Sequence, residues 1–415
     1  DPKPWIPTSR PASSGKPLGI NLGGITDFSA SLIFLDRFKR GRKWVSQSHT
    51  QSVWDDGRPV DTDSYGYVRS LLSDQKAFSM FFTDTGDMIC PVGLYELSYQ
   101  GNPGPLTVEG LPTAFSITGT AEMISHDAVN KRAIVQLNNC GAAGLVINAV
   151  PNSNDYARDF TLVHVDDLES YNSGKIFSDV FLNNWKDFSI FRFMDWGETN
   201  NSNITTWESR AKVGDFSIPG NLNGVPLETM IALANELQID PWFCVPHLAT
   251  DEYIRNMVTL IRDTLDPNLT FYIEYSNETW NYMFEQNGYA QDQGIALELV
   301  DDGNRYLAGV RFHYLRTAQM GTIAAEVMAD RREQMVVTVG EFTEIKWRAD
   351  QGFEYLDAIN MSGEIDAIAV APYIGGELGY PESMDVVANY TIDQLLDEVE
   401  AAIPERMANV TEFVA

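Results

Sequence analysis

Polar residues that could carry chemistry follow short apolar runs at regular intervals in the second half of the chain. In order, these are Arg192, His247, Glu278, Glu341 and Tyr373. If the runs are strands of one parallel fold, the polar groups converge where the strands end, at the edge where such folds place their active sites. A carboxylic acid kept protonated there by burial beside apolar or aromatic groups can act as a general acid. This convergence is the main evidence in the sequence for an active site.

The apolar runs alternate with amphipathic helices after about residue 185. The expected strands are 17–24, 188–194, 241–246, 270–275, 335–339 and 365–370, and the expected helices are 226–237, 254–261, 303–330 and 392–403. Apolar strands that alternate with helices indicate a parallel sheet covered by helices. We therefore predict an α/β fold of the (β/α)8 TIM-barrel type. An open doubly wound sheet is the competing architecture, although no Gly-rich phosphate loop follows any strand.

A different pattern separates the first strand from the others. Between about 78 and 165, short alternating segments are divided by turn residues, which predicts an inserted antiparallel β-sandwich. The expected organisation is an extended leader at 1–16, the first barrel strand and its connection at 17–75, the inserted domain at 76–170, and the remainder of the barrel at 171–415.

The sequence supplies six barrel strands, whereas a closed barrel of this type needs eight. We therefore expect the last strands to be missing from this chain. Three explanations stay open. A C-terminal fragment completes the barrel, a neighbouring subunit covers the sheet edges, or the strand count is wrong and Glu341 serves as the nucleophile.

The charge of the chain argues against two classes of partner. It has 29 basic and 58 acidic residues, for a net charge of -29. Such an acidic surface repels phosphate backbones and anionic lipids, so we expect neither nucleic acid nor membrane partners. No apolar run reaches the roughly 18 residues of a membrane-spanning helix. No spacing of His, Cys and carboxylates suggests a metal site, and we expect no cofactor.

Several features are typical of a secreted glycoprotein. The chain begins Asp-Pro-Lys-Pro without an initiator Met, as a processed secreted chain would. Of the three cysteines, Cys90 and Cys140 are candidates for a disulfide, with three buried free thiols as the alternative. Candidate N-glycosylation sequons lie at Asn200, Asn203, Asn268, Asn277, Asn360, Asn389 and Asn409. We therefore expect an extracellular location.

The Ser-Asn-Glu sequence that ends at Glu278 resembles the Asn-Glu pair of the retaining (β/α)8 glycoside hydrolases, the cellulase-like superfamily. The resemblance implies that Glu278 is the acid/base carboxyl and that Asn277 holds the sugar 2-hydroxyl. It also implies that Arg192, His247 and Tyr373 are supporting polar residues. These enzymes work by double displacement, with a nucleophile about 5–5.5 Å from the acid/base.

A narrower resemblance covers roughly 185–380. The motifs RFMDW, TNNS and EYSNE followed by Trp are similar to those of a group of secreted, largely uncharacterised glycosidase-like proteins. In such a site Trp196 and Trp280 would offer flat faces to sugar rings, as would Trp242, and Asn201 would contact substrate. All three tryptophans could instead be core residues. We expect Glu274 to point away from the site.

The predicted function is that of a secreted retaining O-glycosyl hydrolase acting on a polysaccharide or oligosaccharide. By resemblance its nucleophile would come from the end of a seventh strand. The alternative is a catalytically inactive structural or carbohydrate-binding subunit of an extracellular filament, sheath or surface assembly. The missing strand, the sequons and the acidic surface suit this alternative. A carboxylate opposite Glu278 would favour the enzyme.

Overall fold

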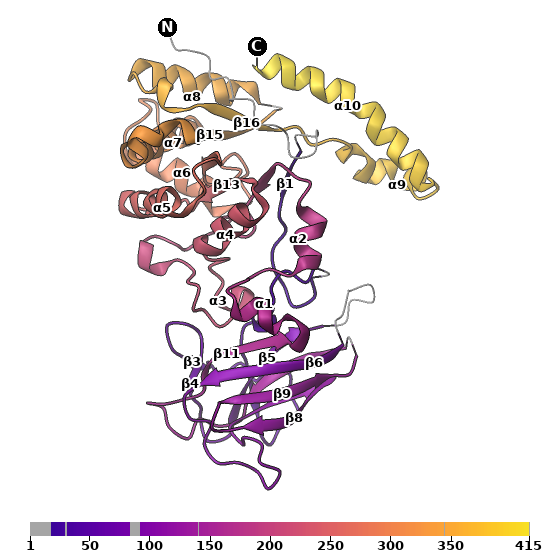
Figure 1. Ribbon diagram of the computed structural model, residues 1–415. Coiled ribbons are helices and arrows are strands. Elements are labelled where there is room, and N and C mark those ends of the chain that lie inside the picture. The colour runs from indigo at the N-terminus through magenta and orange to yellow at the C-terminus, as the bar shows by residue number, and fades with distance from the viewer. Residues whose placement is uncertain (1–17, 30, 84–91, 140, 344, 415) are drawn as a thin grey trace.

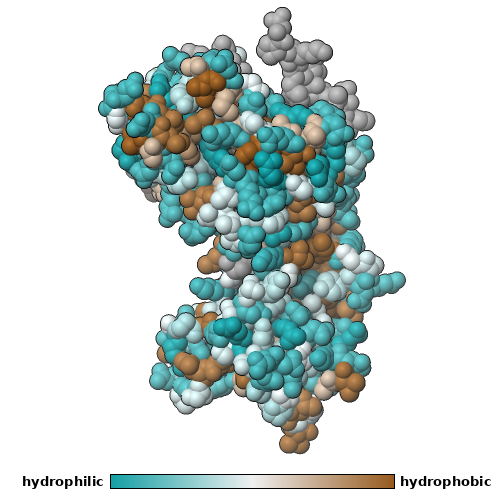
Figure 2. Space-filling view, turned by 90° about the vertical axis from the view of Figure 1, so that its left-hand side faces the viewer, coloured by the Kyte–Doolittle hydropathy of each residue, from teal (hydrophilic) through white to brown (hydrophobic). Residues whose placement is uncertain are grey.

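The computed structural model describes residues 18–29, 31–83, 92–139, 141–343 and 345–414 of the 415-residue chain. The chain forms two lobes joined at a narrow waist (Figures 1 and 2). One lobe is built on a parallel sheet and its helices, and the other on antiparallel strands.

The parallel sheet has six strands whose spatial order follows their order in the chain. They are β1 (Gly19–Asn21), β12 (Ile190–Arg192), β13 (Asp240–Val245), β14 (Phe271–Tyr275), β15 (Met335–Phe342) and β16 (Ala367–Ala371). Every neighbouring pair is parallel. Because strand-to-strand crossovers are right-handed and all run in one direction, the helices gather on one face of the sheet. The other face is left for polar side chains.

The predicted (β/α)8 barrel is wrong. Among the described residues, β1 and β16 are the outer strands of an open sheet and do not pair with each other. The competing doubly wound architecture is also wrong, because that fold reverses its strand order and this sheet does not. Local patterns identify strands that are buried and parallel. Closure depends on a pairing between the first and last strands, which no local pattern encodes.

Helices fill the connections of the parallel lobe. They are α2 (Asp179–Trp185), α3 (Ile218–Asn221), α4 (Leu227–Leu237), α5 (Asp251–Thr264), α6 (Glu285–Ala296), α7 (Arg305–Met328), α8 (Lys346–Ala358), α9 (Met384–Val387) and α10 (Ile392–Val414). Shorter 3₁₀ turns are η3 (Trp207–Ser209), η4 (Ala329–Gln334), η5 (Ser362–Glu364), η6 (Gly376–Gly379) and η7 (Pro381–Ser383). The long helices at 227–237 and 305–328 match the sequence expectation. Helices α6 and α8 were not expected.

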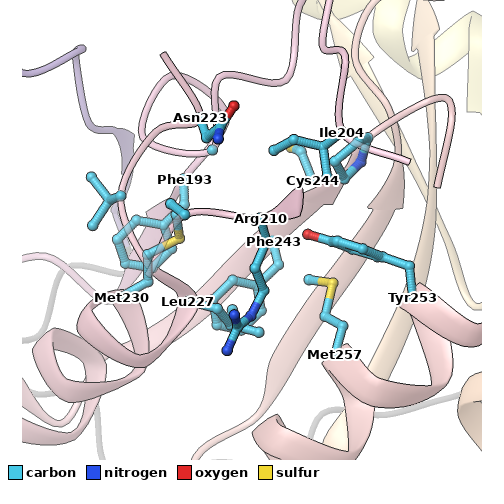
Figure 3. Close-up of a pocket in the computed structure, with 14 residues that line it drawn as sticks. Phe193, Ile204, Arg210, Asn223, Leu227, Met230, Phe243, Cys244, Tyr253 and Met257 are labelled. Atoms are coloured by element: carbon cyan, nitrogen blue, oxygen red, sulfur yellow. The ribbon is translucent and has the colours of Figure 1, made fainter. Parts of the chain in front are cut away.

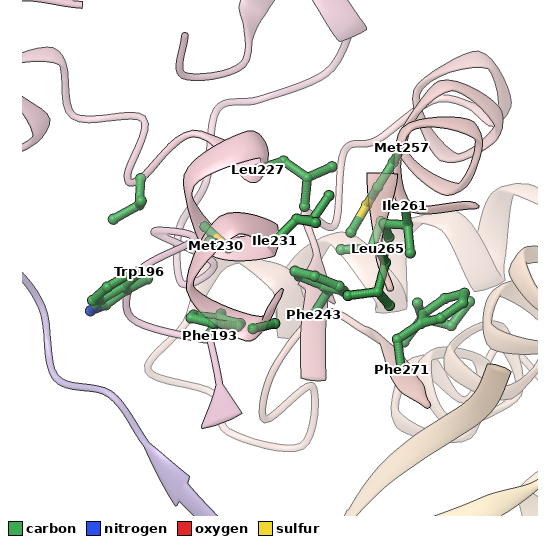
Figure 4. Packing of buried hydrophobic residues seen from close by; sticks show 14 of the residues in the cluster. Phe193, Trp196, Leu227, Met230, Ile231, Phe243, Met257, Ile261, Leu265 and Phe271 are labelled. Atoms are coloured by element: carbon green, nitrogen blue, oxygen red, sulfur yellow. The ribbon is translucent and has the colours of Figure 1, made fainter. Parts of the chain in front are cut away.

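Alternation along the strands divides their side chains between two environments. Phe243 of β13 and Phe271 of β14 pack against Met230 of α4 and Met257 and Ile261 of α5 in one large core (Figure 4). Helix α5 begins where the Thr250 side chain accepts a hydrogen bond from the backbone N–H of Tyr253, an N-cap that satisfies one of the free helix donors. The residues that alternate with these core residues face the opposite side of the sheet.

The second lobe contains two four-stranded antiparallel sheets. One has the order β2 (Val45–Ser48), β5 (Gln75–Phe82), β10 (Ala143–Ile147), β7 (Phe115–Gly119), and the other β11 (Arg158–His164), β6 (Gly93–Gln100), β9 (Arg132–Leu137), β8 (Ala121–Asp127). Strands β3 (Asp61–Thr62) and β4 (Val68–Ser70) form a small hairpin. Both larger sheets bury their side chains in one core, as the faces of a sandwich do.

This lobe starts earlier in the chain than the expected boundary at residue 76. Strand β2 pairs with β5 from Val45 onward, so part of the segment assigned to the barrel connection belongs to the antiparallel lobe. Strand β2 is short and carries alternating Ser and Gln residues, so its sequence gave little strand signal. The lobes are joined by segments that contain the 3₁₀ turns η1 (Arg37–Arg40) and η2 (Val165–Asp167) and the short helix α1 (Leu168–Asn172). Within the described residues, no helix is long and apolar enough to cross a membrane.

Candidate active site

A cavity of about 220 Å³ opens on the parallel sheet, on the side away from the main core. Its lining comes from five consecutive strands of the sheet or the loops that follow them. The lining residues are Arg192, Trp242, Glu274, Asn277, Glu278, Trp280, Gly340, Ala369, Val370 and Ala371. A concave site with aromatic walls and a few convergent polar groups is the usual form of a small-molecule or glycan site.

Strand alternation places Glu274 in this cavity, contrary to the expectation that it points away. Glu274 is the register partner of Cys244 and is adjacent in the sheet to Trp242, on the face opposite Phe243 and Ile273. The chain then turns after β14, where Ser276 and Glu278 have positive φ angles of 61° and 40°. This turn lets Glu278 approach the same cavity as Glu274. The four-residue separation between Glu274 and Glu278 therefore did not indicate which way the Glu274 side chain points.

The Glu278 carboxyl is half-buried and held at both oxygens. The Tyr373 hydroxyl donates to Oε1 at 2.6 Å, and the Asn281 side-chain amide donates to Oε2 at 2.9 Å. Burial, followed by the hydrogen bond and charge of Glu278, raises the pKa of Tyr373 to about 12. Tyr373 therefore keeps its proton near neutral pH and remains a donor. Two donors fix the orientation of the carboxyl beside the cavity.

Asn277 is the centre of a second, more buried network. Its Oδ1 accepts from Arg192 Nη2 at 2.9 Å, and its Nδ2 donates to Asn200 Oδ1 at 2.9 Å. Gln286 of α6 donates both to Asn200 Oδ1, at 2.7 Å, and to the Asn277 carbonyl, at 2.9 Å. Arg192 and Asn200 thus hold the side-chain amide of Asn277 in one orientation, and Gln286 fixes its backbone carbonyl.

Glu274 anchors Arg192 on the floor of the cavity. Arg192 donates to Glu274 Oε2 from Nε at 3.1 Å and from Nη2 at 2.8 Å, and Trp242 Nε1 donates to the same oxygen at 2.9 Å. The Arg192 guanidinium also lies 5.4 Å from the centre of the Trp242 ring. A Cβ on Gly340 would approach Glu274 Oε1 to 2.6 Å. The glycine therefore provides the space that this carboxylate occupies.

Two further predicted residues support the site in different ways. Trp280 lines the cavity, and its ring is nearly parallel to that of Phe342, with centroids 6.4 Å apart. Asn201 is exposed and does not line the cavity. Its backbone N–H donates to Gln286 Oε1 at 3.1 Å, and its Oδ1 accepts from the Glu285 N–H at 2.8 Å. Asn201 therefore holds the start of α6, which in turn holds Asn277.

Two of the predicted residues lie in the protein core. Trp196 is 1% exposed, packs among aromatic rings, and donates from Nε1 to the Gly23 carbonyl at 3.2 Å. His247 is buried, and its ring packs edge-on against Tyr289 at a centroid distance of 5.2 Å. Burial lowers the pKa of His247, which favours its neutral form. Neither residue lines the cavity.

Glu341 faces the helices rather than the cavity. It follows Gly340 in β15, so strand alternation turns its side chain to the opposite face. There it is fully buried, accepts from Arg348 Nε at 2.9 Å, and lies 3.9 Å from His313 Nδ1. The structure therefore does not bring this candidate nucleophile to Glu278.

The sequence missed Asn281 and Gln286, expected Glu274 to point away, and left Trp242 open between a sugar-facing and a core role. The signal for the last two was available, because Trp242, Cys244 and Arg192 alternate with core residues on neighbouring strands. Asn281 and Gln286 belong to a loop and to a helix that the sequence pattern did not identify, so their roles required the tertiary structure.

The sequons fall into two groups. The side chains of Asn277 and Asn200 are engaged in the network beside the cavity, and Asn277 is only 4% exposed. Asn203, Asn268, Asn360 and Asn389 are exposed, and Asn409 is half-buried on α10.

The suggested pair Cys90 and Cys140 lies outside the described residues. Cys244 is a buried free thiol.

No group of three or more His, Cys, Asp or Glu side chains is arranged to hold a metal ion within the part of the chain that the structure describes.

A cavity of about 40 Å³ lies among Phe193, Met230, Phe243 and Met257 (Figure 3). Its lining is mostly apolar and contains no carboxylate.

Comparisons with known proteins add little. No family model matches the chain, and no curated protein matches it. A solved structure described as "The active site of a carbohydrate esterase displays divergent catalytic and non-catalytic binding functions" is 7% identical. The alignment covers 76% of this chain and 86% of that chain, with a TM-score of 0.21. A likeness this weak carries no argument about fold or function.

Proposed function

We propose that this protein binds a glycan in the cavity on the parallel sheet and that Glu278 acts there as the acid/base of a retaining glycoside hydrolase. The observation that carries the proposal is the fixed carboxyl of Glu278, held by Tyr373 and Asn281 beside the oriented amide of Asn277. Trp242 and Trp280 supply the aromatic walls that C–H-rich sugar faces prefer. The proposed location is extracellular.

The proposed chemistry assigns a separate task to each group. Glu278, in its protonated form, donates a proton to the glycosidic oxygen as the bond to the leaving sugar breaks and a second carboxylate, the nucleophile, bonds to the anomeric carbon. By resemblance that nucleophile would come from the end of a seventh strand, and none of the described residues is assigned this role. As a carboxylate, Glu278 later accepts a proton from the water that displaces the nucleophile from the sugar. The Asn277 amide is placed to hydrogen-bond a sugar hydroxyl. Arg192 and Glu274 are positioning residues, since they act through Asn277.

The proposal is tested by incubating the full chain with a panel of β-linked polysaccharides and measuring the reducing ends released. We expect Glu278→Gln to lower kcat by about 10²–10⁴-fold, which is the usual contribution of general acid catalysis, while glycan binding persists. Glu326→Gln is a matched control because Glu326 is exposed on α7, in a surface pair with Arg255. Unchanged hydrolysis in Glu278→Gln would rule out the assigned role.

One observation favours a second candidate function, glycan binding without hydrolysis. Double displacement requires a second carboxylate as nucleophile. Among the described residues that line the cavity, that carboxylate is Glu274, whose Oε2 is already bound by Arg192 and Trp242. Binding of a glycan by the wild-type chain, with no hydrolysis of any bound glycan, would establish this second function. Loss of binding in Trp280→Ala would then locate it in the cavity.

A further inference from the structure

A larger cavity, of about 290 Å³, lies at the junction of the two lobes. The antiparallel lobe contributes Tyr67 and residues 159–161, and the parallel lobe contributes Ile218, Pro226 and Thr229. The connecting segments supply the rest of the wall, including Asp36, Lys39 and Tyr171. The waist in Figure 2 marks where the two lobes meet. None of these residues lines the cavity proposed for glycan binding.

The walls of this junction cavity are rich in rings and aliphatic groups. Phe34, Tyr67, Phe160, Tyr171 and Ile218 all line it. Tyr67 is held in place because its hydroxyl donates to the Gly214 carbonyl at 3.3 Å. Such walls favour a ligand with a compact apolar body, whose transfer from water supplies most of the binding free energy.

Asp36 gives the cavity a polar group that the protein does not satisfy. Its Oδ1 accepts from the backbone N–H groups of Phe38, at 3.1 Å, and Leu162, at 3.0 Å. Its Oδ2 is buried and has no hydrogen-bond partner among the described residues. Buried oxygens are nearly always paired, because an unpaired one loses its hydration without compensation. A donor on a ligand would restore that missing bond.

The surrounding charges select a neutral donor. Lys39 interacts electrostatically with Asp36, and its ammonium group donates to the backbone carbonyl of Val213 at 3.1 Å, so it would repel a cationic ligand. Asp159 and Asp215 line the same cavity and would repel an anion, and Lys212, which also lines it, would repel a cation. A hydroxyl group meets these conditions without adding charge.

We propose that the junction cavity is a binding site for a small neutral molecule that carries a hydroxyl group on an aromatic or alicyclic ring. The hydroxyl donates to Asp36 Oδ2, and the ring packs against the aromatic walls. Because both lobes contribute to these walls, the bound molecule stabilises their junction. This site does not depend on the proposed glycan chemistry.

The test uses the full chain and three hydroxylated probes: 4-methylphenol, cyclohexanol and 2-phenylethanol. Binding is measured by titration calorimetry and by the shift in unfolding temperature at millimolar probe. We expect at least one probe to bind and to raise the unfolding temperature. Two probes should bind more weakly: toluene, which lacks the hydroxyl of 4-methylphenol, and 4-methylbenzoate, which carries a charged carboxylate in its place.

Two variants locate the site. Asp36→Asn keeps an oxygen for the N–H groups of Phe38 and Leu162 but replaces the acceptor Oδ2 with a donor, so we expect about tenfold weaker binding of the hydroxylated probe. Ile176→Trp enlarges a side chain that lines the cavity and is 36% exposed, and should reduce binding of every probe. Asp263→Asn, on the exposed face of α5, is the matched control and should bind as the wild type does.

Either of two results would overturn the proposal. The first is that no probe binds the folded wild-type chain, which would mean that water satisfies Asp36, for example in the gap of about 10 Å³ that it also borders. The second is that Asp36→Asn binds the probes as tightly as the wild type. If Asp36→Asn does not fold, probe binding by Ile176→Trp is compared with that by Asp263→Asn. Equal binding by these two variants would show that the probes do not bind in the junction cavity.

Discussion

Two buried glutamates on neighbouring strands of the parallel sheet each pair with an arginine, and the two pairs have different surroundings. Glu274 of β14 pairs with Arg192 on the cavity face, and Glu341 of β15 pairs with Arg348 on the helix face. The Arg192 side chain is 21% exposed, whereas that of Arg348 is 2% exposed. Arg192 also donates a hydrogen bond to Asn277 and so orients a residue of the candidate site. The same two residue types therefore serve a binding site in one place and the packing of helices in the other.

The groups around Glu341 and Glu274 also differ. Glu341 lies against His313 and Tyr314 of α7. Burial raises the pKa of Glu341, and the positive charge of Arg348 opposes that rise. Glu274 instead faces a cavity that can admit water or a ligand. A charge that water can reach is less costly to leave unpaired, so the two pairs should respond differently to mutation.

The largest expected effect comes from removing each arginine in turn. Arg348→Met leaves Glu341 buried without its partner, and we expect a loss of about 3–5 kcal/mol in the free energy of unfolding. Arg192→Met should cost less, about 1–3 kcal/mol, because Trp242 Nε1 still donates to Glu274 Oε2 and the guanidinium that is removed borders the cavity. Urea unfolding measures both. Glycan binding should fall in Arg192→Met and persist in folded Arg348→Met, and the reverse ranking would mean that the roles of the two pairs are misassigned.

A smaller effect is expected from the pH dependence of the helix-face pair. Burial, and then the charge of Arg348, lowers the pKa of His313 to about 3, from 6.5 in the unfolded chain. Because the folded pKa is depressed, the stability that neutral His313 contributes is complete above pH 6.5 and is lost as the pH falls toward about 3. Glu341 acts in the opposite direction, since its folded pKa is raised.

His313→Phe isolates this contribution, because it removes the titrating ring and keeps a residue of similar size. Between pH 7 and pH 4.5 the wild type should lose about 1–3 kcal/mol more unfolding free energy than His313→Phe. Urea unfolding at a series of pH values gives both curves. Parallel curves over this range would show that His313 is not held neutral by its surroundings.

The smallest expected effect concerns the space that the cavity-face pair requires. Gly340→Ala would place a Cβ 2.6 Å from Glu274 Oε1, so the carboxylate must shift, at a cost of about 1–2 kcal/mol. Glycan affinity should fall as well, because the positions of Arg192 and Asn277 depend on that of Glu274. Gly363→Ala is the matched control, since a Cβ there would have no neighbour within 4 Å. Equal stability and affinity in the two variants would show that Glu274 tolerates displacement.

The sequence predicted a site centred on the end of β14, and the structure places Glu278, Asn277, Arg192 and Tyr373 within one connected region. It was able to do so because polar residues that interrupt apolar runs can be recognised from one short segment at a time. The same reasoning failed for His247 and Trp196, which are equally polar or aromatic but lie in the core. Residue type alone does not tell on which side of a strand a side chain lies.

The sequence by itself determined the parallel strands, the long helices, and the antiparallel segment between the first strand and the others. Each follows from a period of two or of 3.6 residues, which is a local property. Tertiary structure decided that the six-stranded sheet is open, that Glu274 faces the cavity, and that Glu341 faces the helices. These outcomes depend on strand register and on pairings between distant segments, so they are fixed only when the sheet assembles.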